Sequence, residues 1–104
     1  MGFVQIIEYQ TSRMEEIEAL GREFREQSAN TPGVGKPLKG TVTADTERPG
    51  YYLSIIEFES QEVAMEASNR PETQEFFGRM SGLMEGPPKF YNLDVLDTWE
   101  MGGA

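Results

Sequence analysis

Two carboxylates, Glu57 and Asp94, are the side chains of this sequence that are best suited to proton transfer. Each lies in a run of β-branched and aromatic residues, where a charged side chain is rare unless it has a partner or a function. A carboxyl group desolvated by apolar neighbours has a raised pKa and can accept a proton from a phenol or an enol. We therefore predict Glu57 and Asp94 as catalytic residues. A salt bridge to Arg48 or Lys39 is the alternative for Glu57. For Asp94 the alternative is hydrogen bonding to backbone and water.

Amide and aromatic side chains elsewhere in the sequence could orient a small ligand. An amide both donates to and accepts from ligand oxygens, and an aromatic ring offers a flat apolar surface. The residues that we predict as ligand-binding are Gln5, Tyr9, Tyr51, Asn69, Asn92 and Trp99. The alternatives are structural: the tyrosines fill space, Asn92 satisfies backbone and water, Asn69 belongs to a helix kink, and Trp99 holds a partner subunit.

The sequence contains no histidine and no cysteine. These absences exclude Ser-His-Asp and Cys-His catalysis, zinc sites built from thiolate or imidazole, disulfides, and haem held by a proximal histidine. Any general base must then be Asp, Glu, Tyr or Lys. We predict a site without metal and without cofactor.

The 104-residue chain has a net charge of −9, from 18 acidic and 9 basic residues. This charge repels phosphate backbones and anionic lipid headgroups, so we expect neither nucleic acid nor a membrane as partner. No apolar stretch approaches the roughly 20 residues that cross a bilayer, and the N-terminus lacks the basic region of a secretory signal. Together with the lack of cysteine, these features predict a cytoplasmic protein.

Local patterns predict the order β-α-β-β-α-β. Runs of β-branched and aromatic residues predict strands over 3–9, 38–44, 51–59 and 89–99, and 33–37 is expected as a loop. Ser12 and Glu15 form a capping box for a helix that ends before the Asn-Thr-Pro-Gly sequence at 30–33. Ser60 caps a second helix over 61–68, and Pro71 begins a further helical piece. This order is typical of a ferredoxin-like α+β domain, here over 1–100, with a four-stranded antiparallel sheet and a frayed tail at 101–104.

In this topology the helices cover one face of the sheet. From the alternation along each strand, the side chains that we place under the helices are Val4, Ile6, Tyr52, Ile56, Phe58, Tyr91, Leu93 and Val95. The opposite face then carries Phe3, Gln5, Ile7, Tyr9, Tyr51, Leu53, Ile55, Glu57, Phe90, Asn92, Asp94 and Leu96. So large an apolar face is normally covered, and we predict a homodimer with two sheets enclosing a chamber. Glu57 and Asp94 are expected to flank Gln5 in it, about 10 Å apart.

Two segments carry a family resemblance: 55–64 (Ile-Ile-Glu-Phe-Glu-Ser-Gln-Glu-Val-Ala) and 69–76 (Asn-Arg-Pro-Glu-Thr-Gln-Glu-Phe). They resemble the dimeric α/β-barrel superfamily, which includes antibiotic biosynthesis monooxygenases, small polyketide cyclases and haem-degrading monooxygenases. By this resemblance, Gln5 falls where haem-degrading members place a pocket asparagine. Their pocket tryptophan falls at Ala67 and their haem-ligating histidine near Phe77. Both residue types are missing there, so haem degradation is not expected.

The resemblance also implies a dimeric barrel, and in its cofactor-free oxygenases a polyphenolic substrate itself activates oxygen. The leading hypothesis is therefore a cofactor-independent monooxygenase or cyclase-type enzyme that acts on a small aromatic or polyketide-like molecule. The alternative is a non-catalytic homodimer that binds a small hydrophobic ligand or serves as an accessory protein. The sequence leaves open whether the chain is an enzyme.

Overall fold

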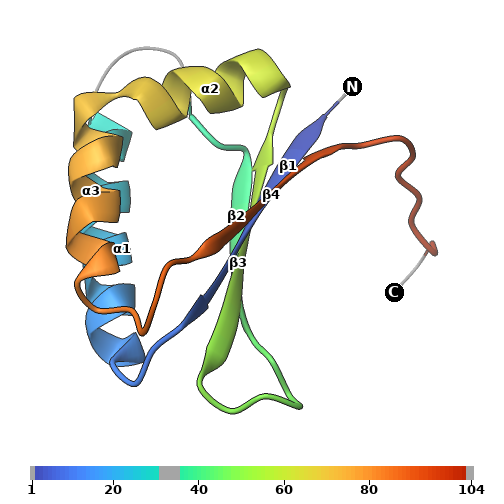
Figure 1. Ribbon diagram of the computed structural model, residues 1–104. Coiled ribbons are helices and arrows are strands. Elements are labelled where there is room, and N and C mark those ends of the chain that lie inside the picture. Colours follow the sequence, from blue (N-terminus) through green and yellow to red (C-terminus); the bar gives the residue numbers. More distant parts are fainter. Residues whose placement is uncertain (1, 31–35, 103–104) are drawn as a thin grey trace.

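The computed structural model describes residues 2–30 and 36–102. The elements, in chain order, are β1 (Phe3–Gln10), α1 (Met14–Asn30), β2 (Lys39–Ala44), β3 (Tyr51–Phe58), α2 (Gln61–Asn69), α3 (Pro71–Ser81) and β4 (Lys89–Asp94) (Figure 1). The loop predicted over 33–37 and the end of the tail predicted over 101–104 fall largely outside the described residues. Within those residues, no helix combines the length and the apolar character that crossing a membrane requires.

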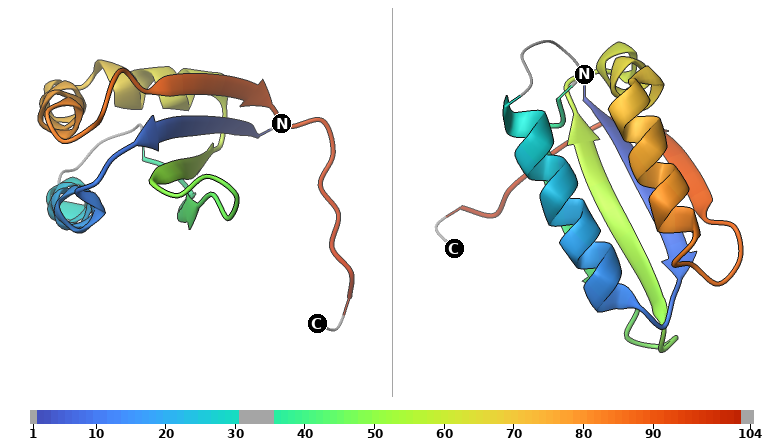
Figure 2. Two further views of the ribbon diagram at one scale, coloured as in Figure 1. Left: turned by 60° about the horizontal axis from the view of Figure 1, so that its bottom comes forward. Right: turned by 90° about the vertical axis from the view of Figure 1, so that its left-hand side faces the viewer.

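The four strands form one antiparallel sheet in the order β2-β3-β1-β4. Figure 2 shows the helices against one face of this sheet, while the described residues leave the other face open. This is the ferredoxin-like arrangement that the sequence predicts. The second helical region is split into α2 and α3, because Arg70 between them has an extended backbone. As predicted, Ser60 Oγ accepts a hydrogen bond from the N–H of Val63 at 3.2 Å, and Pro71 opens α3.

The start of α1 differs from the prediction. The helix begins at Met14, so the capping box of Ser12 and Glu15 is not formed. Thr11 fixes the approach to the helix instead, because its Oγ1 accepts from the N–H of Arg13 at 2.9 Å and donates to the carbonyl of Leu83 at 2.6 Å. Thr11 is only 1% exposed. It therefore ties the start of α1 to the residues that follow α3, a long-range contact that the local sequence does not reveal.

The faces predicted for β1 and β4 are wrong, whereas the face predicted for β3 is right. Phe3, Ile7 and Tyr9 are buried beneath the helices, at 5%, 3% and 3% exposed. Both alternations of β1 are apolar, so its period of two cannot indicate which set is buried. The pairing of β1 with β4 fixes the orientation of β4 as well. Phe90 pairs with Ile7 and therefore also lies on the helix side. The alternation with the larger side chains fills the space under the helices.

The sheet face away from the helices, here called the uncovered face, keeps an apolar centre after this correction. Paired residues of adjacent strands share a face. The register therefore places on the uncovered face Val4, Ile6, Glu8, Lys39, Thr41, Thr43, Tyr51, Leu53, Ile55, Glu57, Lys89, Tyr91 and Leu93. At one edge Arg48 lies 4.4 Å above the Tyr51 ring and 3.6 Å from the Glu8 carboxylate. An apolar surface with a charged rim is thus left open.

The last strand ends at Asp94. The sequence had predicted a longer strand that extends to Trp99. The N–H of Val95 still donates to the carbonyl of Gly2 at 3.0 Å, but no residue of β1 remains to pair with the chain beyond that point. The following segment extends away from the sheet (Figure 1). Its large apolar side chains, Leu96, Trp99 and Met101, are 84%, 73% and 76% exposed. Such exposure is unusual for tryptophan and leaves these side chains available to a partner.

Candidate functional site

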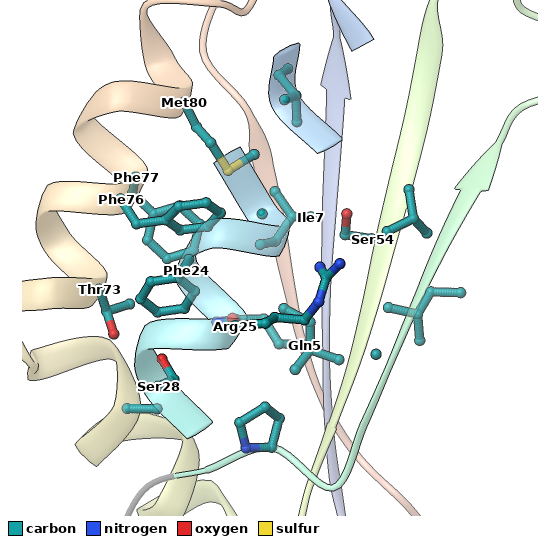
Figure 3. Close-up of a pocket in the computed structure, with 18 of the residues that line it drawn as sticks. Gln5, Ile7, Phe24, Arg25, Ser28, Ser54, Thr73, Phe76, Phe77 and Met80 are labelled. Atoms are coloured by element: carbon teal, nitrogen blue, oxygen red, sulfur yellow. The ribbon is translucent and has the colours of Figure 1, made fainter. Parts of the chain in front are cut away.

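A cavity of about 550 Å³ lies between the helices and the sheet (Figure 3). Residues of two hydrophobic clusters line it, one around Ile7 and Met80 and the other around Phe58 beneath α2. The volume is within the range of small-molecule sites, about 300–1,000 Å³. The sequence predicted a chamber between two subunits, whereas this cavity lies within one chain.

The helix side of the cavity is an aromatic wall. Phe24 of α1 stacks on Phe76 of α3, with ring centroids 4.4 Å apart and ring planes 11° apart. Phe77 continues the row, and its ring centroid lies 5.5 Å from that of Phe76 and 6.0 Å from that of Phe90 of β4. Figure 3 shows these α1 and α3 rings together with Met80 facing the sheet. Aromatic side chains beside a flexible thioether form an apolar surface that suits an aromatic molecule.

The sheet side of the cavity presents the polar side chains of Gln5, Tyr9 and Ser54. Gln5 Nε2 donates to Asn92 Oδ1 at 3.1 Å, while the side-chain oxygen of Gln5, Oε1, accepts no hydrogen bond from the described residues. The Tyr9 hydroxyl donates to Met14 Sδ at 3.8 Å and shares a hydrogen bond of 3.3 Å with Ser54 Oγ. Gln5 is therefore the residue of this group with an acceptor free for a ligand hydroxyl.

Burial raises the pKa of the Tyr9 hydroxyl, and this effect outweighs the opposing hydrogen bond to Ser54. In the unfolded chain Tyr9 ionises near the ordinary tyrosine pKa of about 10. As pH rises from that value through the higher folded pKa, the unfolded state loses its proton first and is stabilised relative to the folded state. We therefore expect the free energy of unfolding to fall across this alkaline window, and to fall less in the Tyr9→Phe variant.

Urea unfolding at about pH 8 and about pH 11, on either side of the ordinary tyrosine pKa, measures this effect. The parent should lose more free energy of unfolding between the two conditions than Tyr9→Phe loses. Equal losses in the parent and in Tyr9→Phe would contradict a buried, neutral Tyr9.

The structure brings together part of the predicted ligand-binding set. Gln5 and Tyr9 line the cavity, and Asn92 is connected to it through its hydrogen bond to Gln5. This grouping arises because Gln5 and Asn92 are direct partners in the register of β1 and β4. The other predicted ligand-binding residues lie apart from the cavity: Tyr51 on the uncovered face, Asn69 at the end of α2 and Trp99 in the exposed C-terminal segment.

The two carboxylates predicted as catalytic lie on opposite faces of the sheet. Glu57 pairs with Val4 and Asp94 pairs with Phe3, and these adjacent residues of β1 point in opposite directions. Glu57 is thus on the uncovered face, and Asp94 is on the helix side at an exposed position. The expected arrangement, with both carboxylates beside Gln5 around one ligand, does not form.

Sequence reasoning missed the residues that α1 contributes to the polar edge of the cavity. Gly21, Arg25 and Ser28 all line it, at the spacing i, i+4, i+7 of one helical stripe. The stripe runs beside the apolar one that ends at Phe24. The sequence did contain a signal for this stripe. Gly21 and Ser28 are small residues one turn before and one turn after Arg25, and they leave space beside the buried face of the helix. Ser54 was also missed, although it is a small polar residue within an apolar strand.

No protein-family model matches the sequence, and no curated protein matches it either. Solved structures do match, and they define the class of fold. The chain has the fold of the antibiotic biosynthesis monooxygenases, small α+β proteins with a ferredoxin-like sheet.

Among these structures is SnoaB, a cofactor-independent oxygenase from Streptomyces nogalater. It matches with a TM-score of 0.75 over 93% of this chain and 95% of its own, at 12% identity. A Caulobacter crescentus protein assigned as an antibiotic biosynthesis monooxygenase gives a TM-score of 0.76 over 92% of this chain and 91% of its own, at 17% identity. Rv0793 from Mycobacterium tuberculosis gives a TM-score of 0.74 over 96% of this chain and 100% of its own, at 13% identity. Identities this low show the shared fold, and the activity has to be argued from the cavity.

Proposed function

We propose that this protein is a cofactor-independent monooxygenase whose small aromatic or polyketide-like substrate binds in the cavity between the helices and the sheet. The observation that carries the proposal is that the stacked rings of Phe24 and Phe76 line the same cavity as Gln5, whose side-chain Oε1 accepts no hydrogen bond from the described residues. A phenol can stack on the wall and donate its hydroxyl hydrogen to Gln5 at the same time. The description of SnoaB as a cofactor-independent oxygenase agrees with such chemistry.

The chemistry needs no group beyond the substrate and oxygen, because an electron-rich phenol supplies its own electrons. Loss of a proton gives a phenolate or enolate, whose ring carbon bonds to O₂. In the keto tautomer of the phenol, this ring carbon is a CH₂ group. Cleavage of the O–O bond converts that CH₂ into C=O and releases water, so that R₂CH₂ + O₂ gives R₂C=O + H₂O. The protein has to bind the ring, orient its hydroxyl and accept the first proton.

Glu18 is the residue that we assign to accept this proton. Among the described residues that line the cavity, it alone carries a carboxylate. A positioned general base contributes about 10²–10⁴-fold to rate, so Glu18→Gln should lower kcat by at least about tenfold. Glu57 and Asp94 lie away from the cavity, so Glu57→Gln and Asp94→Asn should turn over substrate at the parent rate. Loss of turnover in either of these variants would support the sequence-based assignment instead.

Oxygen uptake with a panel of hydroxylated naphthalenes and anthrones tests this function. In buffer with a chelator and no added cofactor, each product molecule should consume one O₂. Glu15→Gln is the matched control for Glu18→Gln, because Glu15 is an exposed glutamate of α1 that does not line the cavity. Binding of these phenols without oxygen uptake would favour the alternative, a non-catalytic homodimer that binds a small hydrophobic ligand.

The proposal includes a homodimer in which the uncovered face of one copy covers that of the other. Its centre is formed by Val4, Ile6 and Ile55, and Leu93 beside them is 44% exposed. Apolar patches of this kind are rarely left in water. The C-terminal segment supplies further contact, with Trp99 lying on the partner.

Nucleic acid and membranes are not proposed as partners of a chain with a net charge of −9, and the cytoplasm is the proposed location.

A further inference from the structure

The charges around the cavity are opposite in sign to those of the chain as a whole. The sequence has 18 acidic residues and 9 basic ones. The described residues that line the cavity nevertheless include one acid, Glu18, and four bases, Arg22, Arg25, Lys36 and Arg70. Cations gathered in one concavity raise the local concentration of anions even when the net charge of the protein is negative.

Most of these cations have no acidic partner. Arg70 pairs with Glu72 at 3.2 Å. Arg22, Arg25 and Lys36, by contrast, form no ion pair with any described residue, despite the excess of acids in the chain. A guanidinium is always charged and presents donors that match a carboxylate in two parallel hydrogen bonds. The cavity therefore offers unpaired positive charge to whatever it binds.

Gly21 lets one of these cations lie along the cavity. Arg25 folds back over Gly21, so that a Cβ added at Gly21 would lie 3.3 Å from Arg25 Nη1. Figure 3 shows the guanidinium of Arg25 directed toward the sheet between Gln5 and Ser54. The same end of the cavity thus combines the free acceptor of Gln5 with a charged donor, opposite the aromatic wall.

We propose that the cavity selects an anionic aromatic ligand: a planar ring system that bears a carboxylate or a comparable oxyanion. The rings pack on Phe24 and Phe76, and the anion binds at Arg25 and Arg22. This inference rests on the proposed function only in taking the cavity as the ligand site. A neutral molecule with the same rings leaves the cations unpaired and binds less tightly.

Two fluorescent dyes with one ring skeleton test this selectivity: 8-anilinonaphthalene-1-sulfonate, which is anionic, and N-phenyl-1-naphthylamine, which is neutral. The parent should bind the anionic dye about tenfold more tightly than the neutral one. The double variant Arg22→Gln/Arg25→Gln should remove this preference while changing the affinity for the neutral dye by less than about twofold. Arg13→Gln/Arg79→Gln is the matched control, because it removes the same two positive charges from arginines that do not line the cavity, one just before α1 and one in the last turn of α3.

The outcomes separate the two proposals. Equal affinities of the parent for the two dyes, or an equal loss of both in the double variant, would overturn anion selectivity and leave the cavity as a ligand site. A Gly40→Trp variant, which places an indole in the cavity, should lose both dyes. If neither dye binds the parent, or if both still bind Gly40→Trp, the cavity is not the ligand site and both proposals fail.

Discussion

Replacing Gly40 with tryptophan should close the cavity and raise the dissociation constant of any ligand bound there by at least about tenfold. Gly40 lies on β2 opposite Ile56, lines the cavity, and would place an added Cβ in open space with nothing within 4 Å. Aromatic residues are favoured in strands, and glycine weakens them. The variant should therefore fold with a free energy of unfolding equal to that of the parent or up to about 1 kcal/mol higher.

Titration with the dyes measures the affinity, and urea unfolding followed by circular dichroism measures stability. Gly78→Trp is the matched control, since Gly78 is exposed on α3, an added Cβ there also meets nothing within 4 Å, and the residue does not line the cavity. It should bind ligand like the parent. A Gly40→Trp protein that is folded and binds ligand with unchanged affinity would place the site elsewhere on the molecule.

Replacing Ile6 with aspartate should convert the homodimer into a folded monomer. Ile6 lies at the centre of the uncovered face, between Ile55 on β3 and Tyr91 on β4. In a face-to-face dimer the new carboxylate loses its water and has no partner, which costs several kcal/mol. The dimer dissociation constant should rise at least about a hundredfold, whereas the monomer keeps the carboxylate in water and loses little stability.

Sedimentation velocity over a range of concentrations measures this equilibrium. Trp99 gives a second readout, because it is the single tryptophan of the chain and is 73% exposed in one copy. Its emission should lie at shorter wavelength in the parent dimer and shift to longer wavelength on dilution or in Ile6→Asp. Met65→Asp is the control, since Met65 is 57% exposed on α2, and it should remain dimeric. A parent protein that sediments as a single copy at working concentration would refute the dimer.

The elements could be predicted because their signals act between neighbours along the chain. Ser60 caps α2 through a residue three positions on, and Pro71 opens α3 by its own ring geometry. The orientation of β3 could be predicted because one of its two alternating sets of side chains contains the charged Glu57. That set is expected to face away from the helices. The start of α1 could not be predicted, because Thr11 is held by Leu83, whose position depends on α3.

The candidate site divides in the same way. Gln5 and Tyr9 could be selected as polar groups within an apolar strand. The part played by Arg25 could not be foreseen, because it depends on how α1 lies over the sheet and on the space above Gly21. The cavity itself is a gap between two layers, and its place is set by side chains from both.

Composition and local sequence by themselves determined the order of the elements, the acidic charge, and the exclusion of histidine and cysteine chemistry. Only the tertiary structure decided which alternation of β1 and β4 lies beneath the helices, and with it that Gln5 meets Asn92 while Glu57 and Asp94 separate. The physical reason is that a strand with two apolar faces shows the same pattern in either orientation. Only packing against the helices makes one orientation more stable than the other.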